Sequence, residues 1–496
     1  MIVSVLEQLP VLQVVLPLLA APLCVILRRR SLAWALFVAI TWVGLAISAL
    51  LAGQVALGGP VTYALGGWNP PVGIGYRIDH FNAFVLVVVS GIAAVVAPYA
   101  RASVMAEVPA ERGYLFYALL LLLLAGLLGI TITGDAFNLF VFLEISSLSS
   151  YALIAMGTSR RALMASFQYL IMGTIGATFL LIGIGLLYMM TGTLNMADLA
   201  ERLPAVYGTS TVEAALAFIV IGASLKLALF PLHAWLPGAY GTAPSVVSAF
   251  LAATATKVAA YTLIRFLFTI FGVGFAFGTL PAGLVLGALA VAAMLYGSFA
   301  ALFADDLKRL LAWSSAAQIG YIVLGVALAT PAGLTAAILH LLNHGVIKGA
   351  LFLAAGCLFW RLGSTRLTDL AGAARLMPWT CAAIVAAGLG LIGIPGTAGF
   401  ITKWYLLVAL LDSPVPWLVA VVLVTSLLAA LYLGRVVEML YFRAPSATAA
   451  ESGEAPLSML AATWVLVALN FAIGLHSAPA VKYAQAAAAT LLGDAS

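Results

Sequence analysis

The chain has 496 residues, of which 64% are hydrophobic and only 8% are charged. Soluble domains carry about 25% charged residues, so this composition excludes an ordinary soluble protein and indicates a surface that faces lipid. The formal net charge of +5 does not indicate a nucleic-acid partner, because apolar segments follow one another along the chain and the basic residues lie between them. We therefore expect an all-α polytopic membrane protein without a folded soluble domain.

Fourteen apolar segments are long enough to be membrane-spanning helices, which need roughly 20 residues each. The seventh and the twelfth contain proline or glycine inside the apolar stretch, and we expect both to be broken. The fourteen expected spans lie near residues 9–27, 31–53, 80–99, 114–133, 136–156, 163–191, 213–236, 244–270, 279–303, 309–329, 333–360, 378–410, 415–440 and 457–476.

The basic residues between these segments predict how the chain sits in the membrane. Lys and Arg favour cytoplasmic loops. With both termini placed outside, fourteen basic residues fall inside and three fall outside. This sorting predicts a multi-pass protein of the bacterial cytoplasmic (inner) membrane with both termini outside. The inside set is Arg28, Arg29, Arg30, Arg101, Arg112, Arg160, Arg161, Lys308, Arg309, Arg361, Arg366, Arg375, Arg435 and Arg443, and the outside set is Arg77, Arg202 and Lys482.

Charged residues inside the spans are candidate functional residues, because a charge at the bilayer centre costs at least about 2.5–3.5 kcal/mol. Glu144 lies in the middle of the fifth span, in GDAFNLFVFLEISSLSSYALIA, and is the only carboxylate that we expect well inside a span. One interpretation is a structural ion pair with a neighbouring helix. The other is a carboxylate that responds to a mobile cationic partner during transport.

The seventh span combines a lysine with helix breakers, in IGASLKLALFPLHAWLPGAY. Pro231 and Pro237 follow Lys226 and remove backbone donors, so the helix should kink or break beside the lysine. Broken helices near the bilayer midplane recur at the ion sites of transporters. His233 lies just beyond the break and is either a satisfied core histidine or a further member of the site.

The eighth span carries Lys257 at its centre, in VVSAFLAATATKVAAYTLIRF. Burial disfavours the charged form of a lysine and a nearby carboxylate favours it, and these opposed effects suit a group that exchanges protons. We expect Thr254 and Thr256 to help solvate the ammonium. Arg265 lies two turns further along the span, and we expect it to reach the interface and to have no transport role.

The eleventh span carries a polar stripe on an otherwise apolar helix. His340, His344 and Lys348 are spaced at i, i+4 and i+8, which places them on one helical face. A pair of histidines four residues apart can bind zinc, but no Cys, Asp or third His lies near it in the sequence. We therefore expect no metal here and interpret the stripe as a proton relay.

In the twelfth span, GLIGIPGTAGFITKWYLL contains several helix breakers before Lys403. Gly393, Pro395, Gly396 and Gly399 fall within seven residues, which predicts an interruption with Lys403 in the second half of the helix. The seventh span shows the same combination of a break and an adjacent lysine.

Spans 4–8 and 9–13 therefore form two units of five helices, each with a broken fourth helix. An odd number of spans per unit reverses the orientation, so we expect an inverted repeat, as in many transporters. The expected organisation is an N-terminal three-helix segment over 1–112, a first repeat over 113–275, a second repeat over 276–442, and a C-terminal helix and tail over 443–496.

Together these motifs resemble the antiporter-like, proton-translocating membrane subunits of respiratory complex I, of Mrp-type sodium/proton antiporters and of membrane-bound hydrogenases. The resemblance rests on the mid-helix glutamate, on FPLHAWLP after the lysine of the seventh span, and on GIPGTAGFITKW in the twelfth. It covers nearly the whole chain. Two segments, GDAFNLFVFLEISSLSSYALI and WNPPVGIGYRIDHFNAF, are most similar to the branch formed by the D-type subunits of Mrp antiporters.

The resemblance implies a role for each buried charge. It implies that Glu144 and Lys226 form the ion pair of a first half-channel, while Lys257 is central and Lys403 is the terminal lysine of a second half-channel. It also implies membrane subunits as partners in a larger complex, with protons and Na⁺ or another monovalent cation as the transported ions. The expected proton relay, parallel to the membrane plane, consists of Glu144, Lys226, Lys257, His340, His344, Lys348 and Lys403, with His233 as an additional candidate.

Three functions remain open from the sequence. The first is an ion-translocating subunit of a cation/proton antiporter, the second a proton-pumping subunit of a complex I-like or hydrogenase redox complex, and the third a stand-alone solute/proton transporter. The chain has no CxxC, no glycine-rich nucleotide loop and no haem motif. We therefore expect no cofactor in it, and a transporter subunit or a non-catalytic subunit of a redox complex rather than an enzyme.

Overall fold

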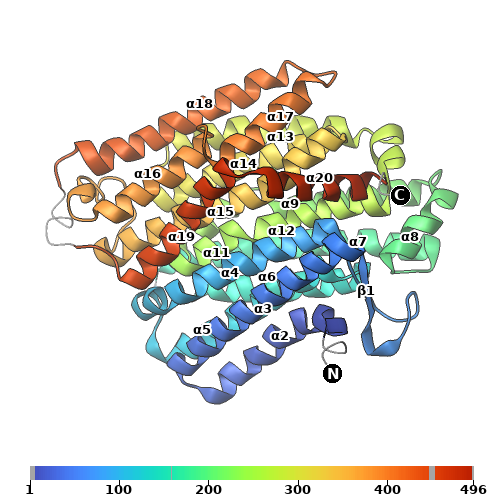
Figure 1. Cartoon of the computed structure of the whole chain (residues 1–496), viewed down its shortest axis with the longest axis horizontal. Helices are drawn as coiled ribbons and strands as arrows, with labels where there is room; N and C mark the ends of the chain where they lie inside the picture. The colour runs from blue at the N-terminus through green and yellow to red at the C-terminus, as the bar shows by residue number, and fades with distance from the viewer. Residues whose placement is uncertain (1–5, 158, 446–452, 494–496) are drawn as a thin grey trace.

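The computed structural model describes residues 6–157, 159–445 and 453–493 and consists almost entirely of helices packed side by side (Figure 1). Thirteen helices of this described chain are long and apolar enough to cross a membrane, and the shorter pair α16 and α17 forms one more, interrupted crossing. The fold is therefore the expected polytopic helical bundle, and its crossings match the expected spans in number and order.

The helices begin and end close to the expected positions. Those of the first half are α2 (Leu9–Leu27), α3 (Arg30–Gly58), α4 (His80–Glu107), α5 (Gly113–Ile132), α6 (Ala136–Ala155), α7 (Arg160–Thr191), α8 (Met196–Arg202), α9 (Ser210–Leu227), α10 (Leu236–Thr242), α11 (Ser245–Ala253), α12 (Ala255–Ile264) and the π-helical turns η4 (Arg265–Ile270) and η5 (Gly274–Thr279). Those of the second half are α13 (Ala282–Leu302), α14 (Leu307–Ala327), α15 (Pro331–Leu362), α16 (Pro378–Ile392), α17 (Ala398–Leu411), α18 (Leu418–Val437), α19 (Leu457–Leu475) and α20 (Ala478–Leu492).

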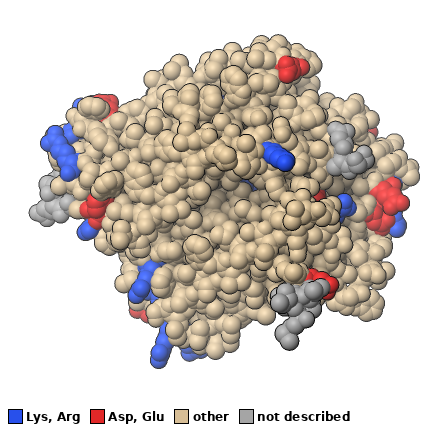
Figure 2. Space-filling model, in the orientation of Figure 1, with Lys and Arg blue, Asp and Glu red and all other residues tan. Residues whose placement is uncertain are grey.

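The connections between the helices lie at two opposite ends of the bundle. The terminal face carries the antiparallel hairpin of β1 (Val61–Ala64) and β2 (Gly75–Ile78), together with α8 and the end of α20 (Figure 1). The other end, here called the arginine-rich face, carries the connections at 28–29, 108–112 and 363–377. Figure 2 shows that charged side chains gather toward the ends of the bundle and leave a broad, nearly uncharged area between them, as contact with lipid requires.

Aspartates set where several helices begin. Asp79 and Asn82 form a reciprocal capping box at the start of α4. Asp135 accepts a backbone hydrogen bond at the start of α6, and Asp306 does the same at the start of α14. Each of these side chains satisfies a backbone N–H that the first helical turn leaves without a partner. The caps thus fix the ends of the spans that hold the candidate site.

Several features of the first half of the chain recur in the second, where the expected repeat remains a prediction. Both α7 and α15 are 32 residues long, and both end at a glycine in the left-handed conformation, Gly192 and Gly363. After each of these helices the chain returns to the capping aspartate of an earlier helix and forms an isolated β-bridge with it. The two bridges pair Asp135 with Asn195 and Asp306 with Arg366. The opposite orientation of the two units remains a prediction.

Two of the helices that carry charged residues are deeply buried. Residues Ser245–Ile270 are 94% buried over their apolar window and α15 is 83% buried, whereas α3, α18 and α19 are 33% buried. In Figure 1, α15 runs through the middle of the bundle. Lys257 and Lys348 therefore face protein rather than lipid, which is the arrangement that makes a charge inside the membrane tolerable.

Two spans differ from the expectation. The eighth span is interrupted at Thr254, whose φ of −124° and ψ of −54° separate α11 from α12. The fourteenth continues beyond a short break at His476 and Ser477 into α20, where the sequence predicted only a tail. This helix packs against α4 and α15. As expected, the seventh and twelfth spans are broken, between α9 and α10 and between α16 and α17.

Candidate functional site

The fifth span presents three polar side chains to Lys226. Glu144, Ser147 and Tyr151 are spaced at i, i+3 and i+7, so they share one face of α6. The Lys226 ammonium lies 3.9 Å from the Glu144 carboxylate, and donates to Ser147 Oγ at 2.7 Å and to Tyr151 OH at 3.4 Å. The predicted pairing of Glu144 with Lys226 is thus present, between a buried lysine and a carboxylate whose side chain is 28% exposed, and two hydroxyl groups support it.

The break in the seventh span places Lys226 at the end of α9. Ala228 has a φ of 61° and ends the helix, two residues after the lysine. The Trp235 indole N–H donates to the Leu225 carbonyl at 3.1 Å, so a carbonyl that the break frees is satisfied by protein. This is the condition for an irregular backbone inside a membrane.

Removing the Ser147 hydroxyl is expected to slow transport without abolishing it. Its hydrogen bond to a charged group contributes roughly 1.5–3 kcal/mol, while Tyr151 and Glu144 remain in place. We expect Ser147→Ala to lower the rate of ion-driven proton exchange in vesicles by about tenfold. Ser149→Ala is the matched control, because Ser149 bonds only the Ile145 carbonyl of its own helix. Equal rates for the two variants would contradict a role for Ser147.

Lys257 lies at the interruption of the eighth span and is completely buried. Its ammonium donates to the Ala252 carbonyl, on the other side of the break at Thr254, and to Thr256 Oγ at 3.3 Å. In a continuous helix the Ala252 carbonyl would accept a backbone hydrogen bond. The break instead turns this carbonyl towards Lys257. Thr256 solvates the ammonium as expected, while Thr254 bonds the Phe250 carbonyl instead.

A small cavity lies between Lys226 and the helix that carries Lys257. Its volume is about 30 Å³, which is room for one water molecule. Ser146, Ser147 and Lys226 line one side, and Val258 and Thr262 of α12 line the other. Apolar side chains such as Leu127 and Leu143 make up most of the remaining lining, and Lys257 itself does not line the cavity.

The polar stripe of α15 faces the protein interior. The His340 and His344 rings stack with centroids 5.5 Å apart, and all four ring nitrogens are buried without a hydrogen-bond partner among the described residues. Lys348 donates to the Leu311 carbonyl at 2.8 Å and to Ser314 Oγ of α14. Buried polar groups in this state require water, so the stripe is suited to hold a water chain.

Close packing brings this stripe to the eighth span. Gly345 of α15 lies against the Ala253 carbonyl at the break, where an added Cβ would be 3.0 Å from that oxygen. Lys257 is near enough to His344 and Lys348 to interact with both electrostatically. The break in the eighth span and the middle of α15 thus form one polar region in the centre of the bundle.

The Lys403 side chain lies at the break of the twelfth span and binds carbonyl groups there. Its ammonium donates to the Leu391 and Ile392 carbonyls at 3.1 and 2.7 Å, the last carbonyls of α16, where the helix dipole favours a cation. It also donates to Ser426 Oγ at 2.8 Å and lies 5.2 Å from the Tyr321 ring centroid. Because the Tyr321 ring stacks at 5.7 Å on His340, Tyr321 connects Lys403 to the stripe.

His233 lies in an aromatic cluster rather than beside a charged group of the relay. Its ring contacts the rings of Phe230, Tyr296 and Trp313 at centroid distances of 5.3–5.4 Å. These contacts are the ones expected of a core histidine. Its part in a relay remains a prediction.

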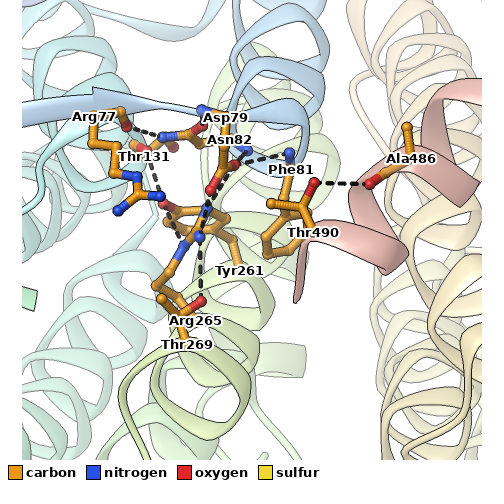
Figure 3. Close-up of polar contacts among 10 residues, drawn as sticks. All are labelled: Arg77, Asp79, Phe81, Asn82, Thr131, Tyr261, Arg265, Thr269, Ala486 and Thr490. Carbon is orange, nitrogen blue, oxygen red and sulfur yellow. Dashed lines mark hydrogen bonds and ion pairs between the residues drawn. The ribbon is translucent and has the colours of Figure 1, made fainter. Parts of the chain in front are cut away.

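Sequence reasoning missed two buried charged clusters at the ends of the eighth span. Arg265, expected at the interface, is buried and binds both carboxylate oxygens of Asp79 at 2.7 and 3.0 Å (Figure 3). At the arginine-rich face, Glu107 accepts from Ser245 Oγ at 3.0 Å, and Lys308 donates to that hydroxyl at 2.9 Å. The expected place of Lys308 in a loop was therefore wrong, because it lies buried in the first turn of α14.

Known proteins resemble this chain over most of its length. The family model described as NADH:quinone oxidoreductase/Mrp antiporter, TM, matches residues 133–429. A Desulforudis audaxviator protein, named as the N-type subunit of NADH-quinone oxidoreductase, is 47% identical over 445 residues, covering 88% of this chain and 87% of that protein. The D-type subunit of the Na⁺/H⁺ antiporter of Bacillus subtilis is 32% identical over 397 residues, covering 79% of each.

A solved structure has the same fold. A chain of the Mrp complex from a Dietzia species superposes with a TM-score of 0.90 at 30% identity, covering 99% of this chain and 98% of that one. The region that the family model matches contains all the residues from Glu144 to Lys403. This polytopic membrane protein therefore belongs to the NADH:quinone oxidoreductase/Mrp antiporter family.

Proposed function

We propose that this chain is the ion-translocating subunit of a cation/proton antiporter complex, similar to the D-type subunit of Mrp antiporters. The observation that carries the proposal is the line of buried charged and polar side chains across the bundle, from Glu144 to Lys403. A water-sized cavity adjoins Lys226, and the ring nitrogens of His340 and His344 are buried without a hydrogen-bond partner among the described residues. Such a line serves ion movement, since each charge is costly to bury and a purely structural core needs none.

The proposed transport step begins at the ion pair of Glu144 and Lys226. While the pair is closed, the carboxylate stabilises the charge of the lysine. When Glu144 is neutralised or moves away, Lys226 loses that stabilisation. Removing one partner of a buried pair costs about 3–5 kcal/mol, which favours release of the proton from Lys226. A proton then passes from Lys226 through the small cavity towards Lys257.

The second half of the proposed path leads from Lys257 to Lys403. Water among His344, His340 and the neighbouring polar groups carries the proton along α15, and Tyr321 brings the path to Lys403. Among the described residues, no carboxylate lies within ion-pair distance of Lys257, Lys348 or Lys403. Protonation of one of these lysines therefore disfavours protonation of the next, so that charge states are coupled along the line.

A second candidate function uses the same relay. The 47% identical relative is named as part of an NADH-quinone oxidoreductase, which favours a proton-pumping membrane subunit of a redox complex. The two functions differ in the energy source and in the partners, both of which lie outside this chain. In either case we propose that the protein lies in the bacterial cytoplasmic membrane among other membrane subunits, with both termini outside.

The experiment that separates these functions is vesicle transport with the neighbouring gene products present. Everted vesicles that contain the chain and its co-expressed partner subunits are acidified by respiration, and NaCl or KCl is then added while the internal pH is followed with a fluorescent dye. The antiporter function predicts that added cation raises the internal pH. Acidification that instead requires a redox substrate and co-purifying iron–sulfur or quinone-binding subunits would establish the second function.

A further inference from the structure

A polar pocket opens at the terminal face above the eighth span. Its volume is about 450 Å³, which is room for roughly 15 water molecules at about 30 Å³ each. The hairpin, the start of α4, η4 and the end of α20 form its walls. Its lining includes the charged residues Arg77, Asp79 and Arg265 and the hydroxyl groups of Thr269 and Thr490.

The floor of this pocket is the ion pair between Asp79 and Arg265. Both residues are nearly inaccessible, at 2% and 6% exposed, and two nitrogens of the guanidinium bind the two carboxylate oxygens. Arg265 also donates to Thr269 Oγ1 at 3.2 Å and to Tyr261 OH at 3.3 Å. Figure 3 shows the two side chains pointing toward each other between the start of α4 and η4, with Tyr261 beside them.

Directly behind the pair lies the central lysine of the relay. Lys257, Tyr261 and Arg265 are spaced at i, i+4 and i+8, so they follow one face of the eighth span. At 1.5 Å of rise per residue, Lys257 is about 12 Å deeper than Arg265 along the helix. Tyr261 fills the space between them, and its hydroxyl donates to the Thr131 carbonyl at 2.9 Å.

An ion pair is an unusual way to close such a pocket if sealing is its only purpose. Apolar side chains of similar volume would exclude water at least as well, and buried ion pairs add little to stability when compared with them. A charged pair differs from an apolar plug in that separating its partners draws water to both. The Asp79 and Arg265 pair is thus suited to open as well as to close.

We propose that the pocket is the route by which the terminal face exchanges water and protons with Lys257, and that Asp79 and Arg265 form its gate. The proposal rests on the proposed function, because it assigns an access path to the relay. In the closed state the pair and Tyr261, which lines the pocket beside it, separate the pocket from Lys257. In the open state its partners part, and water reaches past Tyr261 to the lysine.

The test is the accessibility of single cysteines in the full chain with its partner subunits. The three native thiols, Cys24, Cys357 and Cys381, are all buried and are replaced by alanine. Thr269→Cys reports the pocket. Val258→Cys reports the space behind the gate, because Val258 is next to Lys257, is buried and does not line the pocket. Leu263→Cys is the control on the same helix, buried outside the pocket. A membrane-impermeant cationic methanethiosulfonate is added to right-side-out or inverted vesicles.

The expected result is labelling of Thr269→Cys from the terminal face only, and slow labelling of Val258→Cys. Adding Asp79→Asn, which keeps the shape of the side chain but removes its charge, should speed labelling of Val258→Cys by about tenfold. The labelling rate of Thr269→Cys should change by less than about twofold, and Leu263→Cys should stay unlabelled.

Three results would overturn the proposal. They are labelling of Thr269→Cys from both faces, an unchanged labelling rate for Val258→Cys when Asp79→Asn is added, and labelling of Leu263→Cys in that variant, which would mean general loosening rather than an opened gate. Labelling needs no transported ion. A failure of the vesicle assay would therefore remove the proposed function while leaving these accessibility results interpretable by themselves.

Discussion

Replacing Glu144 with glutamine is expected to reduce cation-driven proton exchange to the background of vesicles that lack the protein. Glutamine keeps the size of the side chain but removes the charge 3.9 Å from the Lys226 ammonium, so the proposed first transport step has no driving interaction. Because Ser147 and Tyr151 still bind the lysine, the variant should insert and accumulate normally. Internal pH in everted vesicles measures the effect.

The control for this variant is another glutamate near the same helix pair. Glu213→Gln changes an exposed carboxylate in the first turn of α9, the helix that carries Lys226, and should leave exchange unchanged. Exchange by Glu144→Gln at the rate of the Glu213→Gln control would show that the carboxylate of Glu144 has no part in transport.

A double variant separates the two interpretations of this ion pair. A purely structural pair can be replaced by neutral side chains at little cost, whereas removing one partner alone leaves an uncompensated charge. If the pair is structural, Glu144→Gln combined with Lys226→Met should restore the exchange that Lys226→Met alone abolishes. If it drives transport, the double variant should regain protein stability but remain inactive.

The parts of this site that the sequence predicted are those whose signal lies within one span. A glutamate or lysine inside an apolar segment is visible by itself, and Pro231 or Gly393 marks a break directly. For the same reason the histidine stripe of α15 was predictable from its spacing. The structure adds the contacts that hold these side chains, such as Ser147 for Lys226 and Tyr321 between the stripe and Lys403.

The parts that were missed depend on contacts between distant segments. Arg265 was expected at the interface because it lies near the end of its span, but its partner Asp79 is 186 residues away in the sequence. Nothing in the local pattern of either span indicates that pairing. The break at Thr254 was missed because AATATKVAA contains neither proline nor glycine, and the lysine that donates to the freed carbonyl is the only local trace of it.

The second large effect is expected from adding one methyl group at the break of the twelfth span. In Gly399→Ala the new Cβ would overlap the Gly390 carbonyl oxygen, so α16 and α17 would have to move apart. Overpacking of this kind typically costs about 1–3 kcal/mol, and more when backbone must move. We expect a clearly lower unfolding temperature in detergent.

The same substitution should also abolish exchange, because the contact lies beside the Lys403 ammonium. Lys403 is one turn beyond Gly399 on α17, and it binds the Leu391 and Ile392 carbonyls that follow Gly390 on α16. Parting the two half-helices therefore draws those carbonyls away from the charge that they stabilise.

Gly434→Ala on the neighbouring α18 provides the comparison, since an added Cβ there meets no atom within 4 Å. Alanine is favoured over glycine inside a helix by about 1 kcal/mol, so this control should keep or raise the unfolding temperature and leave exchange intact. Normal exchange by Gly399→Ala would mean that the half-helices can separate without harm, and that Lys403 does not depend on the α16 carbonyls. A loss of exchange at an unchanged unfolding temperature would instead place the effect on the lysine itself, and Lys403→Met should then reproduce it.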